Sequence, residues 1–413
     1  RNSDLRNTNN IVYEGEKFGW DYDENIRKAN GWAQMQFSLP SLQFFIGGEA
    51  GKSSMWRTGH MQNGRFPNNS LGDSEKLSFT TYGIKGGATW KINGRNYLYA
   101  NGYYGTRAPL FRDAFVAPRT RDLTVPNLEV SKIQSIEGGY LLRAPQYKAR
   151  ITGYLTEFKN ETENVFVSAW SVGRILDELD LGALDLGDDA SFLEQPVFFG
   201  AAVMQGVNRR HAGIEAAVEA KPLTSWVFTA AASIGKYIYT SRPEMLLSLD
   251  NGGTQIIDGG AVYQKNFYVP RTPQTAATVG VKYESRHFWF ASLSLNFADN
   301  FYYEFDRARR TSRFVSGLTP DMPIWNTIID QQKAPSAYTL DFFGGKSWLI
   351  NRKYYIYLNA GINNILDNKD IIVSGRESYR NAFRNDVSDP RFYTSEIIYG
   401  YGLNYFISLT LRI

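Results

Sequence analysis

The chain has 413 residues, which is enough for one large domain or for two or three ordinary ones. It contains no cysteine, which excludes disulfides and Cys-ligated metal sites, and its 45 basic and 41 acidic residues form no basic block of the kind that binds nucleic acid. The mean hydropathy is −0.36 and no run of 18 apolar residues occurs, so a membrane-spanning helix is not expected.

Segments of alternating apolar and polar residues follow one another along the whole chain. Side chains of a β-strand point alternately to its two faces, so a period of two predicts strands. Most segments have 11 to 15 residues, and a strand tilted through a bilayer needs about 9–11. The thirteen predicted strands are 28–39, 42–52, 78–92, 95–106, 130–143, 147–159, 208–221, 226–240, 274–284, 287–298, 338–350, 354–364 and 401–413.

The connections between these segments alternate between short and long. Six are short and contain the Asn, Gly, Pro and Ser of tight turns, whereas the others run from about 23 to nearly 50 residues. Short turns at one rim and long loops at the other are typical of an outer-membrane barrel. A soluble sandwich would have shorter strands, and a propeller or β-helix would show a fixed repeat. The sequence therefore predicts an all-β, transmembrane, antiparallel up-and-down β-barrel with long extracellular loops and short periplasmic turns.

The strand count predicts that the barrel is larger than this chain. Residues 1–27 precede a strand that leads into a short turn, so we expect them to form an extracellular loop segment, with the strands and loops in 28–413. Thirteen strands place the two ends on opposite sides of the membrane, whereas bacterial single-chain barrels have even strand numbers. We therefore expect residues 1–413 to be the C-terminal portion of a larger barrel. If 9–20 is also a strand, the count becomes fourteen and a small closed barrel is the alternative.

The last predicted strand, 401–413, has apolar residues at its odd positions. We expect these to face lipid and the even positions to face the lumen. Under the thirteen-strand count, the edge beyond Ile407 and Leu409 has no partner in this chain. The last strand is therefore predicted to have an open edge.

Six segments resemble TonB-dependent outer-membrane transporters and occur in the order found in that family. Each motif alone is weak, but together they extend over about 310 residues. They are "YYGTRAPLFRDAFVAPRTRD" (103–122), "VPNLEVSKIQSIEGGYLLRAP" (125–145), "RRHAGIEAAVEAKP" (209–222), "VPRTPQTAATVGVKY" (269–283), "YIYLNAGINNILDNKD" (355–370) and "YGYGLNYFISLTLRI" (399–413). Two departures are the final Ile413, where the family usually has Phe, and the basic run at 112–122.

The resemblance implies a barrel of 22 strands, of which this chain holds about 13. It also implies a plug domain inside the lumen and a TonB-binding segment, both upstream of this chain. In the family, substrate binds between the loops and the plug, and the TonB complex supplies the energy for import across the outer membrane. The chain is similar to large Bacteroidota members, including the SusC-type importers of glycans and peptides, in which a surface lipoprotein forms a lid.

The sequence shows no motif for a reaction that makes or breaks covalent bonds. The three histidines lack metal-ligand spacing, no hydrolase or phosphate-loop motif occurs, and we expect neither an enzyme nor a cofactor. The acidic run 176–196 could bind Ca²⁺ through oxygens, although a solvated loop is the simpler interpretation. Aromatic and cationic side chains in the long loops suit sugars or peptides, or else pack loop on loop. The candidate substrate-binding residues are Trp170, Tyr302, Tyr303, Arg307 and Trp325.

These observations predict TonB-dependent active import of a nutrient, which could be a glycan, a peptide or a metal chelate. The expected partners are outer-membrane lipid, the upstream plug and remaining strands, the TonB complex, a possible surface lipoprotein lid and the imported molecule, and not nucleic acid. The alternative function is a passive 14-stranded channel without TonB coupling. A barrel enzyme of the lipase or protease kind is disfavoured because no Ser/His pairing is suggested.

Overall fold

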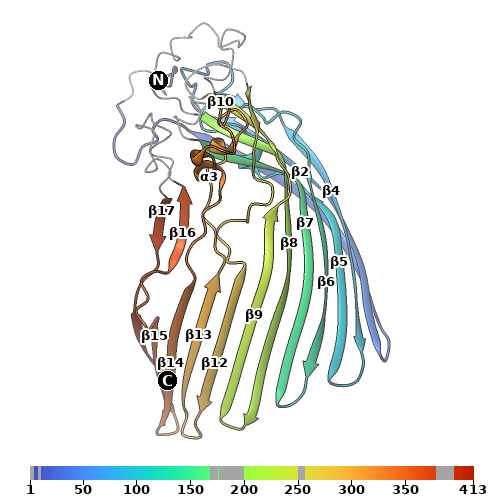
Figure 1. Ribbon diagram of the computed structural model, residues 1–413, viewed down its shortest axis with the longest axis vertical. Helices are drawn as coiled ribbons and strands as arrows, with labels where there is room; N and C mark the ends of the chain where they lie inside the picture. The colour runs from blue at the N-terminus through green and yellow to red at the C-terminus, as the bar shows by residue number, and fades with distance from the viewer. Residues whose placement is uncertain (1–3, 8–10, 168–174, 176–199, 250–255, 378–394) are drawn as a thin grey trace.

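The computed structural model describes residues 4–7, 11–167, 175, 200–249, 256–377 and 395–413. Thirteen of its strands lie side by side in one antiparallel sheet that curves into the wall of a barrel (Figure 1). In sheet order they are β1 (Tyr22–Ser38), β2 (Leu42–Gly59), β4 (Leu77–Lys91), β5 (Asn96–Arg107), β6 (Ser131–Arg143), β7 (Tyr147–Val167), β8 (Gly200–Leu223), β9 (Trp226–Tyr239), β12 (Thr275–Glu284), β13 (Trp289–Asp299), β14 (Ala337–Ile350), β15 (Tyr354–Asn363) and β18 (Asn404–Arg412). The predicted all-β, up-and-down architecture and its thirteen wall strands are confirmed.

The shorter elements lie toward the loop end of the wall and were not predicted. Among the described residues they are β3 (Gly72–Asp73), β10 (Glu244–Leu249), β11 (Ile256–Ala261), β16 (Ile372–Glu377), β17 (Ser395–Tyr399), α1 (Phe111–Ala114), η3 (Ala308–Arg310) and α3 (Pro323–Ile329). β10 pairs with β8 and β11, whereas β16 and β17 form a separate ribbon. Within the described ranges, no helix has the length and apolar character needed to cross a membrane.

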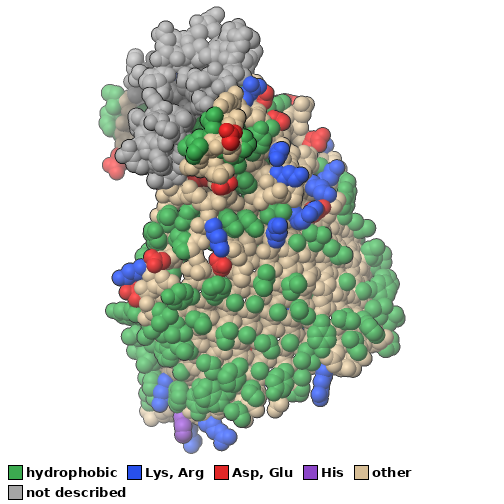
Figure 2. Space-filling view, in the orientation of Figure 1, with side chains coloured by type: hydrophobic (Ala, Val, Ile, Leu, Met, Phe, Trp, Pro, Cys, Tyr) green, Lys and Arg blue, Asp and Glu red, His purple; other side chains and the backbone are tan. Residues whose placement is uncertain are grey.

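The two faces of the wall differ in chemistry, as the alternation predicts. Leu295 of β13 lies opposite Val279 of β12 and Leu340 of β14, and all three side chains share one face. On the other face, Asn296 donates to Thr339 and Asp341 of β14. Figure 2 shows hydrophobic side chains over the strand region, with charged side chains at its turn end and toward its loop end. The apolar face suits lipid, and the polar face lines the lumen.

Several strands continue past the predicted boundaries at the loop end. β1 begins at Tyr22, six residues before the predicted start, so 22–27 belong to a strand rather than to the expected loop segment 1–27. β2 reaches Gly59 and β8 begins at Gly200. In such extensions neither face meets lipid, so the alternation on which the prediction depended is missing. The wall therefore rises past its predicted boundaries and supports the loop segments.

The sheet is open between its first and last strands. β1 and β18 stand at the two ends of the strand order and do not pair with each other in the described structure. β18 pairs with β15 alone, with Ile407 opposite Ala360 and Leu409 opposite Leu358, so its predicted open edge is confirmed. Residues 11–20 contain no strand, which makes the fourteen-strand alternative wrong. As predicted, β1 begins at the loop end and β18 ends at the turn end (Figure 1).

A hydrophobic core forms where the loop segments pack against the loop-end parts of β8 and β9. Met245, Leu247, Phe305, Phe314 and Ile328 are almost completely buried against one another and their neighbours. The loops above this part of the wall therefore fold into a packed layer that rests on it.

A buried ion pair closes this layer. The guanidinium of Arg310 donates to both carboxylate oxygens of Glu377, at 2.7 and 2.5 Å. It also donates to the main-chain oxygens of Asp306, Ile329 and Asp330. A buried guanidinium with this many acceptors fixes its surroundings, so Arg310 joins the 300–334 region to β16.

Candidate functional site

Residues 108–126, here called the inward segment, fold against the lumen-facing side of the wall. Its helix α1 carries Phe111, whose ring is stacked on Phe115 with centroids 4.6 Å apart. Both rings pack with Met55 of β2 and Phe79 of β4, which point to the inner face. The apolar contact explains why a segment rich in arginine lies inside the mouth rather than in solvent.

Arg57 of β2 anchors the far part of the inward segment. Only 2% of this residue is exposed, and its Nε donates to the main-chain oxygen of Pro118 at 2.6 Å. Its Nη1 donates to the main-chain oxygen of Ser70 at 2.8 Å, and its guanidinium lies over the ring of Tyr22, 5.2 Å from the centroid. One buried cation therefore joins β1, β2 and two loops.

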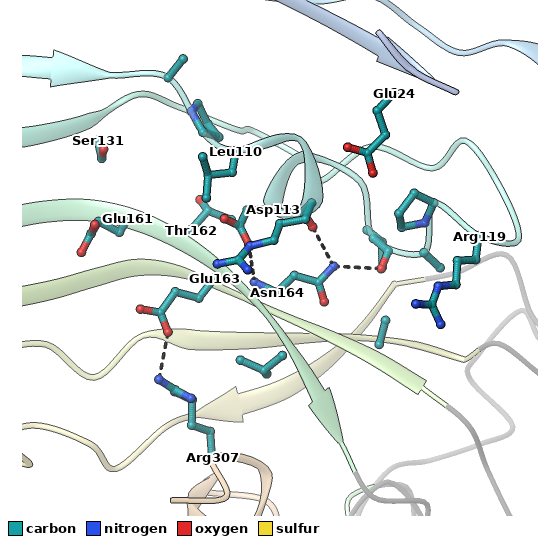
Figure 3. A pocket seen from close by; sticks show the side chains of 18 of the residues that line it. Glu24, Leu110, Asp113, Arg119, Ser131, Glu161, Thr162, Glu163, Asn164 and Arg307 are labelled. Atoms are coloured by element: carbon teal, nitrogen blue, oxygen red, sulfur yellow. Dashed lines mark hydrogen bonds and ion pairs between the residues drawn. The ribbon is translucent and has the colours of Figure 1, made fainter. Parts of the chain in front are cut away.

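Asn164 of β7 holds the near part of the inward segment (Figure 3). Its side-chain amide donates to the main-chain oxygens of Phe115 and Val116, both at 3.1 Å. Its main-chain N–H donates to Asp113 Oδ1 at 3.1 Å. Burial raises the pKa of the Asp113 carboxyl, although the hydrogen bond from Asn164 and nearby arginines act against this shift. The segment is therefore attached to the wall at both ends.

A β-bulge in β7 turns acidic side chains toward the cavity. Phe158 pairs with Arg209 of β8, but the next paired residue is Glu161, opposite Val207, so β7 has one extra residue. Asn160 in the bulge has a φ of +57°, a conformation that Asn tolerates better than most residues. Because the bulge shifts the alternation by one, Glu161 lies on the inner face instead of the outer face.

Two glutamates of β7 bind arginines from three other elements. Glu161 is 4% exposed and accepts from Arg107 of β5 at 2.8 Å and from Arg209 of β8 at 2.6 Å. Glu163 accepts from Arg307 of the 300–334 region at 3.0 Å. Arg307 also donates to the hydroxyl of Tyr239 at 3.0 Å. These buried pairs connect the wall with the loop layer.

The inward segment, the bulge and the loop layer enclose a cavity of about 990 Å³. Its lining includes six arginines, namely Arg107, Arg112, Arg119, Arg209, Arg271 and Arg307. It also includes six carboxylates, namely Glu24, Asp113, Glu129, Glu161, Glu163 and Glu304. A cavity of this size is at the upper end of the range for ligand pockets. Its lining offers many charged hydrogen-bonding groups of both signs and can hold a polar solute.

The five residues predicted to bind substrate have different positions. Arg307 lines the cavity. Tyr302 is stacked on Tyr268 with centroids 4.2 Å apart, Tyr303 is 6% exposed, and Trp325 of α3 packs against the loop core. Those three contacts are the loop-on-loop packing that was the other interpretation. Trp170 and the acidic run 176–196, with its possible calcium site, fall outside the described residues.

Most residues that build the cavity were not selected from the sequence. The break in alternation at Lys159–Asn160, within "FKNETENVF", could have indicated the bulge and hence Glu161. No local signal marks Asn164 or Arg57, because their partners lie far away in the chain. Over the described residues, no group of three or more His, Cys, Asp or Glu could hold a metal ion.

Comparison with solved structures shows which proteins share this fold. The ferric citrate transporter FecA matches with a TM-score of 0.61 at 12% identity, over 98% of this chain and 48% of that one. The copper transporter OprC matches with a TM-score of 0.58 at 12% identity, over 94% and 48%. The siderophore receptor PiuA from Acinetobacter baumannii matches with a TM-score of 0.58 at 13% identity, over 95% and 44%. At these identities the likeness shows a shared fold, and the chain spans about half the length of each.

The family follows from the sequence comparison. The model described as "TonB dependent receptor-like, beta-barrel" matches residues 1–365, and the chain belongs to this family. It is thus an outer-membrane protein of Gram-negative bacteria, as predicted. No curated protein sequence gives a significant match.

Proposed function

We propose that the chain is the C-terminal portion of a TonB-dependent transporter that imports a nutrient across the outer membrane. The observation that carries the proposal is the open thirteen-strand wall, which matches about half the length of proteins named as transporters and receptors. In this proposal, nine further strands and a plug lie upstream in the sequence. The plug occupies the lumen against the polar inner face, and TonB acts on the plug side. The chain makes and breaks no bond.

The substrate site of this proposal is the charged cavity at the mouth. Arg307 forms part of the cavity wall through its ion pair with Glu163, and Tyr302, Tyr303 and Trp325 hold the loop layer in place. Loops and plug together would enclose the solute. The outcome would be a binding site that opens to the lumen only when the plug moves.

The finer placement among SusC-type members of Bacteroidota also belongs to the proposal. It is supported by the likeness of the sequence to large Bacteroidota members of the family. It implies a surface lipoprotein lid that sits on the loop layer. Purification of the full-length protein under mild conditions, followed by mass spectrometry, would recover the lipoprotein, and its consistent absence would contradict the placement.

The import function is tested by uptake in cells that produce the full-length protein. Radiolabelled tetraalanine, maltotetraose and ferric citrate would be supplied separately at low concentration. We expect uptake of one of them to require the receptor and to stop when TonB is removed or the proton gradient is collapsed. Receptor-dependent uptake that persists without TonB and without the gradient would contradict active import and favour a passive channel.

A further inference from the structure

The charges that line the cavity fall into two groups. The first group pairs internally. Glu161 accepts from Arg107 at 2.8 Å and from Arg209 at 2.6 Å, and Glu163 accepts from Arg307 at 3.0 Å. Arg271 likewise forms an ion pair with Glu304. Removing water from such charges is costly unless each keeps its partner. These pairs therefore hold the walls together and are not available to a ligand.

The second group consists of four exposed side chains with weak or uncharged partners. Arg112 is 79% exposed and lies 3.7 Å from Asp113, its neighbour in the chain. Arg119 has its guanidinium over the ring of Trp20, 5.1 Å from the centroid. Across the described part of the chain, neither arginine has a closer ion pair. Two guanidiniums are therefore presented to the cavity.

Among the described residues, the two carboxylates of this group also have no charged partner. Glu24 of β1 accepts a hydrogen bond from the hydroxyl of Tyr22 at 3.3 Å. Glu129 accepts one from the side-chain amide of Asn160 at 2.9 Å. Within the described ranges, neither carboxylate forms an ion pair. The cavity thus offers two free positive and two free negative groups.

All four groups are held on fixed supports. Arg112 and Arg119 belong to the inward segment, which Arg57 and Asn164 attach to the wall. Glu24 stands on β1. Figure 3 shows Glu24 and Arg119 on one side of the view and Glu163 with Arg307 on another. Charges placed in advance bind a complementary ligand without the cost of ordering them.

The balance of charges discriminates between classes of ligand. A neutral glycan needs aromatic faces and neutral hydrogen-bonding groups, and gains little from free charges. An anionic metal chelate would need an excess of arginine, but the lining has six arginines and six carboxylates. A ligand with one positive and one negative end would satisfy both free sets at once. The lining therefore favours a zwitterion.

We infer that the cavity binds a short peptide with free termini. Arg112 or Arg119 binds its carboxylate, and Glu24 or Glu129 binds its ammonium group. The cavity of about 990 Å³ has room for a solute of several residues. The inference depends on the proposed import function, because it names the substrate class of the same site.

The test measures binding to the full-length protein in detergent by calorimetry. The ligands are tetraalanine, its N-acetylated form, its C-amidated form, maltotetraose and ferric citrate. We expect tetraalanine to bind and each blocked form to bind about tenfold more weakly, which corresponds to about 1.4 kcal/mol. Equal binding of free and blocked peptides, or tighter binding of maltotetraose or ferric citrate, would overturn the inference.

Variants assign each end of the peptide. In a protein with Arg112→Gln and Arg119→Gln, amidation should no longer weaken binding, whereas acetylation still should. In a protein with Glu24→Gln and Glu129→Gln, the pattern should reverse. A general loss of structure cannot produce this exchange. Arg210→Gln, on the outer face of β8 beside Glu157, is the matched control and should change neither ratio.

The uptake and binding experiments together distinguish a failure of this inference from a failure of the proposed import function. TonB-dependent uptake of a sugar or a chelate would leave active import standing and would overturn the peptide assignment. If both double variants keep the wild-type ratios for blocked peptides, the assignment of the four residues is wrong.

Discussion

The guanidinium of Arg310 and the carboxylate of Glu377 form a buried bidentate ion pair, although 67 residues separate them in the sequence. Arg310 lies in η3 and Glu377 at the end of β16. The pair joins two segments that otherwise belong to different loops. The loop layer therefore depends on charged contacts as well as on its apolar core.

Glu377→Gln should destabilise the loop layer strongly. The variant leaves the Arg310 charge buried without its counter-ion, which costs roughly 3–5 kcal/mol. Limited proteolysis of 300–334 should become much faster, while the membrane-spanning wall stays folded. The control is Glu396→Gln, because Glu396 pairs with Arg376 at 2.8 Å on the surface and should contribute about 0–1 kcal/mol. Equal effects of the two substitutions would contradict the structural role of Arg310.

Asn164→Ala should release the inward segment. The substitution leaves the main-chain oxygens of Phe115 and Val116 without their donor, at a cost of about 1–3 kcal/mol. Trypsin should then cleave after Arg112 or Arg119 faster than in the parent protein. Asn363→Ala, which removes a surface contact to Asn404, is the control and should not change cleavage there. Unchanged cleavage in both would show that Arg57 and apolar packing hold the segment without Asn164.

Attachment of the inward segment should weaken as the pH rises. Burial raises the pKa of Asp113 above its ordinary value of 3.8 in the folded protein. The folded state therefore binds more protons than the unfolded state between 3.8 and the raised pKa, and stability falls as the pH increases through that window. Asp113→Asn keeps an acceptor for Asn164 and should remove this dependence. The measurement is the tryptic cleavage rate from pH 4 upward, divided at each pH by the rate for a short unstructured arginine peptide in the same mixture. A slope of this ratio that survives in the variant would contradict the prediction.

Leu295→Arg should impair insertion into the membrane. Leu295 lies on the outer face between Val279 and Leu340, and an arginine facing lipid costs about 2–4 kcal/mol near the bilayer midplane. Ser294→Arg, one residue away, faces the lumen opposite Asp341 and should be tolerated. Folding into lipid vesicles distinguishes the two. Comparable losses would mean that the assignment of faces is wrong.

The wall was predictable from the sequence because lipid imposes a local rule on it. Residues such as Ile407 and Leu409 must alternate with polar neighbours wherever one face meets lipid. The same rule fails above the membrane, and so β1 was predicted to begin at residue 28 instead of Tyr22. Alternating apolar and polar residues reveal a strand only where one of its faces meets lipid and the other meets water.

The site was mostly not predictable, because distant contacts build it. Arg307 was selected as an exposed loop cation, yet it is 8% exposed and pairs with Glu163, 144 residues away. Asn164 carries no local mark of its role. Tyr303 has the aromatic character of a binding residue but lies buried among the loops. The composition of the loops identified the region of the site. Only the folded structure shows which side chains line the cavity and which hold the loops together.

The bulge at Asn160 gives the protein a simple route to a new specificity. A single residue inserted or deleted at this point turns the side chains beyond it to the opposite face, so that those lining the cavity exchange with those on the outside. The strand pairing of the wall below the bulge stays unchanged. The lining of the mouth can therefore diverge by changes in length as well as by substitution. Relatives could acquire new cargo while they retain the same membrane anchor.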